Sequence, residues 1–153
     1  MDEDALRGIY NYRRLTDLVA TAGQPSEEEL AAVAHAGFEV VVNLALHDAE
    51  YSLPDERKTV ESLGMRYIYI PVVWERPLYS DLEQFFKVMD QLSGKRVFIH
   101  CAANKRVSVF MALYRQLRQG WTPDSVMPDV LGVWEPDTPW RQFMDEIASK
   151  VSG

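Results

Sequence analysis

The sequence predicts an α/β fold in one domain, residues 1–153, with a mostly parallel sheet of four to five strands flanked by helices. Apolar runs of strand length alternate along the chain with amphipathic stretches of helical period. This alternation is typical of parallel strands joined by helical crossovers. The strand runs are apolar almost throughout, as expected where helices bury both faces of a sheet. The 47% hydrophobic content suits a single core, and no repeat or long linker divides the chain.

Three runs have the length and composition of buried strands: residues 38–46 (FEVVVNLAL), 65–73 (MRYIYIPVV) and 95–100 (KRVFIH). β-Branched and aromatic side chains dominate these runs, and such residues favour strands. The residues before them are less clearly patterned, and residues 21–25 are predicted to form a turn. The third run leads directly into Cys101, the single cysteine of the chain.

Helix starts are indicated by capping residues. Two Ser-x-x-Glu pairs have the spacing of a capping box: Ser26 with Glu29, and Ser80 with Glu83. Two Thr-Pro pairs, at 122–123 and 138–139, each look like an N-cap followed by proline at the first helical position. The predicted helices cover residues 26–36, 54 or 55–63, 81–92 and 105–119, with two more in the C-terminal third.

Composition excludes several kinds of partner. A net charge of -7 and a pI near 4.9 argue against binding to duplex nucleic acid, which needs a basic surface. No apolar stretch approaches the roughly 20 residues of a membrane-spanning helix, so no membrane partner is expected. A single cysteine excludes an internal disulfide and makes a metal site unexpected, and no cofactor is expected. The first residues are acidic where a signal peptide is basic, which predicts a cytoplasmic protein.

Residues 95–110 predict a strand, a tight anion-binding loop and a helix. Ligands of open parallel sheets bind beyond the carboxyl ends of the strands, where Cys101 stands. The helix after the loop directs unpaired amides and its positive dipole end at the loop, which stabilises an anion or a thiolate. Ala102 and Ala103 are small enough for the backbone to close around a ligand, and Arg106 can hold two phosphate oxygens at once. A thiolate, an amide cradle and an arginine together suit phosphoryl transfer through a cysteinyl-phosphate.

The residues HCAANKRVS resemble the signature loop of the protein tyrosine and dual-specificity phosphatases, whose pattern is His-Cys, five residues, Arg, then Ser or Thr. TAGQPS, VVNLAL and G-x-x-Y-x-x-I-P-V at 64–72 follow the order of that family, and the resemblance is closest to the bacterial beta-lactamase hydrolase-like, phosphatase-like domain. It implies a cysteine phosphatase fold. It also implies that Cys101 attacks phosphorus, that Arg106 binds the phosphoryl oxygens and that the hydroxyl of Ser108 eases departure of the thiolate.

Two further residues belong to the predicted phosphate-binding loop, Asn104 and Lys105. Asn104 stands where the signature usually has glycine, and asparagine tolerates the left-handed backbone needed for the same turn. Lys105 could equally contact substrate or be solvated. His100, just before the cysteine, is expected to orient the loop by hydrogen bonds rather than to act as a base.

The spacing within the loop departs from the family pattern, because only four residues separate Cys101 from Arg106. Either the loop is one residue shorter, or Val107 occupies the arginine position and Ser108 keeps its own. Loops of six residues from Cys to Arg are typical of rhodanese-like sulfurtransferases, which carry sulfur as a cysteine persulfide. A sulfurtransferase or persulfide carrier is therefore the second hypothesis, and a non-catalytic phosphate-binding module is the third.

The second departure from the family pattern concerns the general acid. Trp74 stands where dual-specificity relatives have an aspartate after the I-P-V strand. Glu75 is adjacent and Asp81 lies further along, so either of them, or neither, protonates the leaving oxygen. The leading hypothesis is a cysteine phosphatase that acts on a phosphate monoester of a small molecule or a phosphoprotein.

Overall fold

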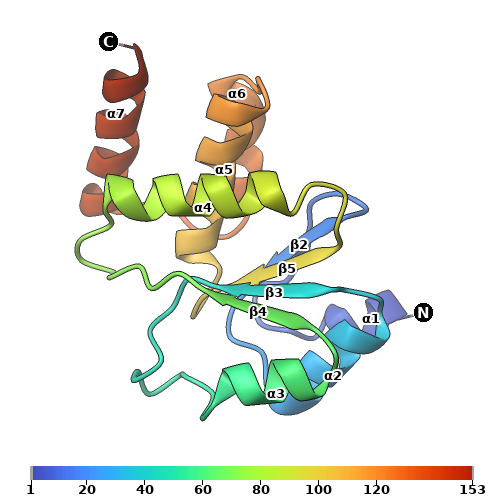
Figure 1. Ribbon diagram of the computed structural model, residues 1–153. Coiled ribbons are helices and arrows are strands. Elements are labelled where there is room, and N and C mark those ends of the chain that lie inside the picture. Colours follow the sequence, from blue (N-terminus) through green and yellow to red (C-terminus); the bar gives the residue numbers. More distant parts are fainter. Residues whose placement is uncertain (1, 153) are drawn as a thin grey trace.

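The computed structural model describes residues 2–152 and places helices on both sides of a five-stranded sheet (Figure 1). The strands are β1 (Arg13–Arg14), β2 (Val19–Ala22), β3 (Val40–Asn43), β4 (Arg66–Tyr69) and β5 (Val97–His100). Their order across the sheet is β1-β2-β5-β3-β4, with β1 antiparallel and the other four parallel. The predicted α/β class and mostly parallel sheet are confirmed.

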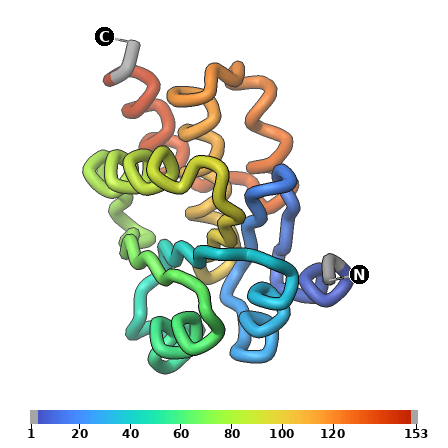
Figure 2. Tube along the Cα trace, turned by 45° about the vertical axis from the view of Figure 1, so that its right-hand side comes forward, coloured from blue at the N-terminus to red at the C-terminus, as the bar shows by residue number. Residues whose placement is uncertain are grey.

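The helices are α1 (Asp2–Leu6), α2 (Glu27–His35), α3 (Glu56–Ser62), α4 (Tyr79–Gln91), α5 (Lys105–Arg118), α6 (Pro123–Leu131) and α7 (Thr138–Ser152). Helices α1 to α3 cover one face of the sheet and α4 to α7 cover the other, so α1 and α7 lie on opposite sides (Figures 1 and 2). Successive residues of a strand point to opposite faces of the sheet and pack in two separate hydrophobic cores. Val41 and Phe98 pack toward α1 to α3, whereas Val42 and Ile99 pack toward α4 to α7.

The capping box at Ser26 is confirmed. The Glu29 backbone N–H donates to Ser26 Oγ at 3.1 Å, and the Ser26 N–H donates to Glu29 Oε1 at 2.9 Å. The cap at Thr122 is also confirmed, because its Oγ1 accepts from the Ser125 N–H at 3.2 Å. Local hydrogen bonding therefore fixes where α2 and α6 begin.

The other two predicted helix starts are wrong by one or two residues. Ser80 lies inside α4, which begins at Tyr79, and Asp81 Oδ2 accepts from the Leu78 N–H at 3.2 Å. Thr138 lies inside α7, and Asp137 Oδ1 accepts from the Trp140 N–H at 3.3 Å. At α7 an aspartate before the helix accepts a first-turn amide, whereas at α4 an aspartate in the first turn accepts the amide of the residue before the helix. Several side chains near a helix start can accept such amides, and the path of the incoming chain selects one.

The predicted turn at residues 21–25 is wrong in its first half. Thr21 and Ala22 belong to β2, which pairs with β5 in parallel and brings Ala22 opposite His100. β3 and β4 are shorter than predicted, with four residues each. A four-residue VATA strand has little pattern of its own, so pairing with β5 defines it.

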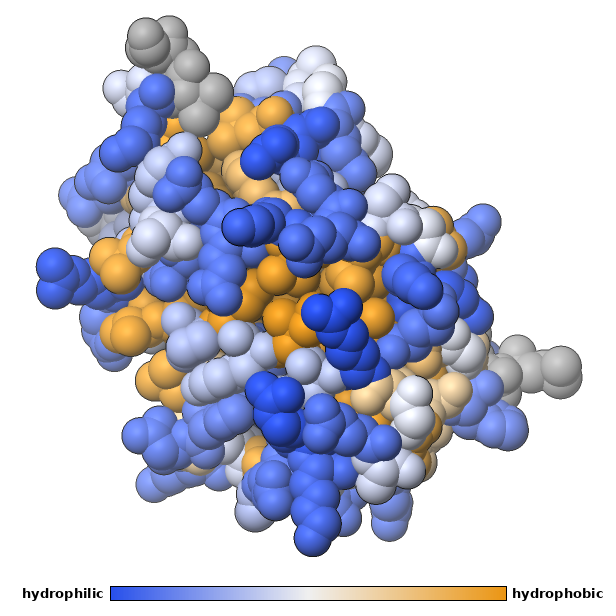
Figure 3. Space-filling view, in the orientation of Figure 1, coloured by the Kyte–Doolittle hydropathy of each residue, from blue (hydrophilic) through white to orange (hydrophobic). Residues whose placement is uncertain are grey.

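Within residues 2–152, no helix is both long and apolar enough to cross a membrane. On the face seen in Figure 1, apolar surface is gathered across the middle, with hydrophilic residues around and over it (Figure 3).

Candidate active site

Residues 101–104 connect β5 to α5 at the carboxyl edge of the parallel strands. Cys101 comes directly after β5, its N–H donates to Ala22 O at 3.3 Å, and its exposed fraction is 1%. Cys101 belongs to the core on the α4 to α7 side, whereas Phe98, an odd number of residues before it, packs on the other side. The sulfur therefore lies on the face of the sheet from which α5 rises.

A pocket of about 380 Å³ opens at this edge. It is lined by Leu46, Ala49, Tyr51, Trp74, Glu75, Cys101, Ala102, Ala103, Lys105 and Arg106. The fold thus brings the predicted nucleophile, the predicted arginine, three loop residues and one of the two acid candidates to one cavity. Asn104, Ser108 and Asp81 do not line it.

The loop backbone is held from outside by the N-terminal segment. Gln24 N–H donates to Ala102 O at 2.9 Å, and Asn11 Nδ2 donates to Ala103 O at 2.9 Å. In a trans peptide the C=O and the following N–H point in opposite directions. The amide of Ala103 therefore points away from Gln24.

Asn104 makes the turn into α5 with a left-handed backbone, φ 65°, as predicted. Its side chain is buried, and its Nδ2 donates to Asn11 O at 2.9 Å and to Thr21 Oγ1 at 3.0 Å. Asparagine thus replaces glycine and also ties the loop to β2.

Arg106 is the arginine of the pocket. It is 4% exposed, and its Nη1 donates to Val72 O at 2.8 Å while its Nη2 donates to Tyr51 OH at 3.2 Å. The guanidinium lies 5.8 Å from the Trp74 ring centroid, within cation-π range. Val107 is buried in the core, so the loop is one residue shorter than the family pattern. A guanidinium has five N–H groups, and these two bonds leave others for an anion.

The remaining site candidates lie in different surroundings. Glu75 is exposed at the pocket rim. The Asp81 carboxylate accepts from the N–H of Leu78, just before α4, and burial raises the Asp81 pKa more than this hydrogen bond lowers it. Ser108 Oγ donates to Lys105 O at 2.7 Å and accepts from Trp134 Nε1 at 3.1 Å, so its proton is used by the α5 backbone.

Sequence reasoning missed Glu56, the first residue of α3. Its side chain is buried, and its Oε2 lies 2.6 Å from His100 Nε2. The other ring nitrogen of His100 lies 3.2 Å from Cys101 O, as expected for a histidine that orients the loop. Burial acts to raise the pKa of Glu56, but the hydrogen bond and charge of His100 outweigh it, so this pKa is lowered. An acidic residue at a helix start is ordinarily solvated, and the sequence carries no signal of this pairing.

Tyr51 and Trp74 also form the pocket without having been predicted as site residues. The Tyr51 hydroxyl accepts from Leu46 N at 3.2 Å as well as from Arg106, so it joins the loop after β3 to the arginine.

Among the described residues, no group of three or more His, Cys, Asp or Glu side chains could hold a metal ion.

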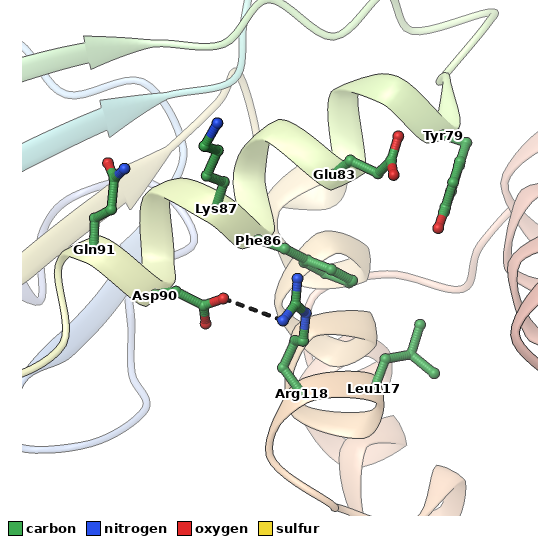
Figure 4. A pocket seen from close by; sticks show the side chains of 8 residues that line it. All are labelled: Tyr79, Glu83, Phe86, Lys87, Asp90, Gln91, Leu117 and Arg118. Carbon is green, nitrogen blue, oxygen red and sulfur yellow. Dashed lines mark ion pairs between the residues drawn. The ribbon is translucent and has the colours of Figure 1, made fainter.

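A larger groove, of about 610 Å³, lies between α4 and the C-terminal part of α5 (Figure 4). It is lined by Tyr79, Glu83, Phe86, Lys87, Asp90, Gln91, Leu117 and Arg118. Asp90 and Arg118 form an ion pair of 3.3 Å there, and the Arg118 guanidinium lies 5.5 Å from the Phe86 ring centroid. It shares no residue with the Cys101 pocket, and neither Cys101 nor Arg106 lines it, so it is not the candidate active site.

The family model described as "DSP-PTPase phosphatase fused to NAD+ Kinase" matches residues 12–129, a span that includes β1, the Cys101 loop and most of α6. The chain belongs to this phosphatase family. The solved structure of a candidate phosphatase (DUF442) from Shewanella putrefaciens is 34% identical, with a TM-score of 0.85, over 96% of this chain and 97% of that chain. Among curated proteins, none matches the chain.

More distant phosphatases share the fold of this family member. The PP-IP phosphatase SIW14 from S. cerevisiae is 15% identical, with a TM-score of 0.74, over 94% of each chain. A cysteine-to-serine variant of P. aeruginosa TpbA, solved with phosphotyrosine, is 18% identical, with a TM-score of 0.65, over 79% of this chain and 72% of that chain. The cysteine phosphatase fold expected from the signature loop is therefore confirmed.

Proposed function

We propose that this protein is a cysteine-dependent phosphatase that hydrolyses a phosphate monoester through a cysteinyl-phosphate. The observation that carries the proposal is the placement of Cys101 and Arg106 in one pocket, at the two ends of the loop that joins β5 to α5. Membership of the phosphatase family supports the same reaction class.

In the first half-reaction, the Cys101 thiolate attacks phosphorus and the bond from phosphorus to the leaving oxygen breaks. The leaving oxygen keeps the electron pair and takes a proton from the Glu75 carboxyl. The Arg106 guanidinium and the Ala103 amide hold the non-bridging oxygens, where charge is concentrated in the transition state. Glu75 is preferred to Asp81 because it lines the pocket.

In the second half-reaction, water attacks the cysteinyl-phosphate and gives a proton to the Glu75 carboxylate. The phosphorus–sulfur bond breaks, the electron pair returns to sulfur, and inorganic phosphate leaves. The hydroxyl of Ser108, which the family resemblance assigns to this step, is bonded to Lys105 O. We therefore assign the stabilisation of the returning thiolate to the loop amides and the dipole of α5.

The substrate is a phosphorylated small molecule or a phosphoprotein, and this phosphatase acts on it in the cytoplasm. The pocket is lined by the charged Arg106 and Lys105 and by apolar and aromatic side chains, so the group that carries the phosphate lies against apolar surface. These side chains are Leu46, Ala49, Tyr51 and Trp74. Lys105 lines the pocket and provides a second positive charge there. Its Nζ lies 5.5 Å from the Trp134 ring centroid.

Sulfur transfer is a second candidate, because the spacing of Cys101 and Arg106 matches six-residue sulfurtransferase loops. In that reaction the Cys101 thiolate attacks the outer sulfur of thiosulfate, sulfite leaves with the electron pair, and cyanide then takes the persulfide sulfur to give thiocyanate. The family match and the fold favour the phosphatase.

The test compares the purified protein with Cys101→Ser in two assays, p-nitrophenyl phosphate hydrolysis and thiocyanate formation from thiosulfate and cyanide. We expect phosphate release by the wild type and none above the buffer rate by the variant, with equal thermal unfolding midpoints for both. Thiocyanate formation alone would replace the phosphatase with the sulfurtransferase. Silence in both assays, with inorganic phosphate still bound, would leave a binding module.

A further inference from the structure

The Tyr51 hydroxyl lies where two hydrogen-bond donors meet beside the candidate active site. The Leu46 N–H donates to it at 3.2 Å, and Arg106 Nη2 donates to it at 3.2 Å. Tyr51 stands on the loop after β3, and it lines the same cavity as Cys101 and Arg106. Its side chain is 37% exposed, so a ligand in this cavity can reach it.

Counting protons shows that the hydroxyl has a donor to spare. A backbone N–H and a guanidinium can only donate, so the Tyr51 oxygen is the acceptor in both contacts. A phenol carries one O–H of its own, which neither contact uses. Within residues 2–152, Tyr51 makes no other side-chain hydrogen bond. The proton of this hydroxyl is therefore available to a ligand in the pocket.

Arg106 can place an oxyanion beside this proton. Val72 O takes one N–H of Arg106 Nη1, and the Tyr51 oxygen takes one N–H of Nη2. Each of these nitrogens carries two N–H groups, so an oxygen of a bound anion can take the second N–H of Nη2. Two acceptors of one amino group lie roughly 5 Å apart at ordinary hydrogen-bond lengths. A tetrahedral anion is wide enough for another of its oxygens to lie between them and accept from Tyr51.

We propose that Tyr51 is a further catalytic residue, whose hydroxyl donates a hydrogen bond to a non-bridging phosphoryl oxygen of the group that Arg106 binds. The bond from Arg106 polarises the hydroxyl, because hydrogen bonds in a chain strengthen one another, and this makes the O–H a better donor. The role in hydrolysis rests on the proposed phosphatase function. The contact with phosphate can be measured without turnover.

Tyr51→Phe removes the hydroxyl and keeps the aromatic wall of the pocket. Arg106 retains its bond to Val72 O at 2.8 Å. The matched control is Tyr69→Phe, because the Tyr69 hydroxyl accepts at 3.0 Å from the N–H of His47, the residue after Leu46. Each variant removes one anchor of the loop after β3, but Tyr69 does not line the pocket.

The first measurement is the dissociation constant of inorganic phosphate, obtained by NMR titration of each protein. We expect Tyr51→Phe to bind phosphate about tenfold more weakly than wild type, a change typical of losing one hydrogen bond to a charged group. Tyr69→Phe should bind phosphate as wild type does. Equal affinities of Tyr51→Phe and wild type, or an equal loss in both variants, would contradict the inference.

A second measurement separates donation to phosphate from the anchoring of Arg106. In wild-type protein labelled with ¹³C at tyrosine Cζ, the Tyr51 signal should move downfield, toward the phenolate position, when phosphate saturates the site. The reason is that the O–H then donates to an anion. This measurement needs no variant, so it holds even if Tyr51→Phe does not fold. An unmoved signal would mean that Tyr51 only anchors Arg106, and the inference would be wrong.

Kinetics with two substrates test which oxygen the hydroxyl contacts. An alkyl phosphate and p-nitrophenyl phosphate have the same non-bridging oxygens, so Tyr51→Phe should lower kcat/KM for both by the same factor, about tenfold. A loss confined to the alkyl phosphate would assign the proton to the leaving oxygen and overturn the inference. A phosphate-dependent Tyr51 signal in a protein that hydrolyses neither substrate would overturn the proposed function and leave the contact of Tyr51 with phosphate intact.

Discussion

Arg106 is fixed before a ligand arrives. Its guanidinium donates to Val72 O and to the Tyr51 hydroxyl, so the loop after β3 and the end of the β4 segment together set its direction. A charge held in place by the protein needs little reorganisation when a phosphoryl group enters, and this is the main source of electrostatic catalysis. The short loop from Cys101 is compatible with the phosphatase proposal because the arginine reaches the pocket from the second residue of α5.

The proton donor is either Glu75 or Asp81, and substituting each of them should affect hydrolysis rates differently. Glu75→Gln should slow hydrolysis of an alkyl phosphate by about 10²–10⁴-fold, because the poor leaving group needs a proton. Hydrolysis of p-nitrophenyl phosphate should fall much less, because its leaving group departs as a stable anion. Steady-state kinetics with both substrates measures the difference.

Asp81→Asn is the matched comparison, since the Asp81 carboxylate bonds the start of α4 and does not line the pocket. It should leave the ratio of the two rates unchanged. A loss confined to the alkyl phosphate in Asp81→Asn, with Glu75→Gln unaffected, would reverse the assignment.

At the scale of elements, the site depends on the contact between the Cys101 loop and the turn after β2. Gly23 pairs with Ala103 as an isolated bridge, and its N–H donates to Tyr10 O at 2.7 Å. A Cβ at Gly23 would lie 2.6 Å from Ala102 O and 2.9 Å from Tyr10 Cδ2. Both distances are too short, so this position needs glycine because of the close approach of two backbones.

Gly23→Ala should therefore displace the loop. We expect a loss of about 1–3 kcal/mol of unfolding free energy, typical of a side chain forced into a packed site. We also expect weaker inhibition by inorganic phosphate, because the loop amides move. Urea unfolding and phosphate inhibition measure the two effects. In Gly8→Ala the new Cβ would have only one neighbour, Ala5 O at 4.0 Å, so this control should change neither. Wild-type behaviour of Gly23→Ala would show that the loop does not rely on this contact.

At the scale of the whole molecule, Asp129 joins three distant parts of the chain. On α6, its carboxylate accepts from Arg13 Nη2 of β1 at 2.9 Å and from Arg115 Nη1 of α5 at 2.7 Å. Arg115 is 3% exposed, and Asp129 supplies the opposite charge beside its buried guanidinium. Burial acts to raise the pKa of Asp129, but the two arginines outweigh it, so the pKa is lowered.

This lowered pKa makes a prediction about stability and pH. A carboxyl whose pKa is lower in the folded than in the unfolded state contributes its full stability above the unfolded value, and that contribution is lost as the pH falls through the folded value. Asp129→Asn should cost about 1–3 kcal/mol at pH 7, as for hydrogen bonds to charged groups. The difference from wild type should shrink as the pH falls below the ordinary aspartate value of 3.8. Urea unfolding from pH 7 downward measures it.

The control for this prediction is Asp4→Asn, because the Asp4 and Arg7 side chains are 77% and 67% exposed. Exposed pairs contribute little, so the variant should match wild type at every pH. A cost for Asp129→Asn that stays constant as the pH falls would exclude the ionised carboxylate as its cause.

The sequence by itself determined the α/β class, the presence of a strand within each of residues 38–46, 65–73 and 95–100, and the placement of Cys101 between a strand and a helix. Each of these depends on neighbours within a few positions: apolar periodicity, the capping box at Ser26, and the backbone preference of Asn104. Such signals are local, so they can be recognised in the sequence alone.

Only the tertiary structure decided which side chains meet. It showed that β2 is an inner strand, that Arg106 and not Val107 reaches the pocket, and that Glu75 lines the pocket while Asp81 does not. It also paired Glu56 with His100 across 44 positions of the chain. These contacts join segments that are close only after the sheet has assembled, and the free energy that selects them comes from pairing and burial in the whole fold rather than from local preference.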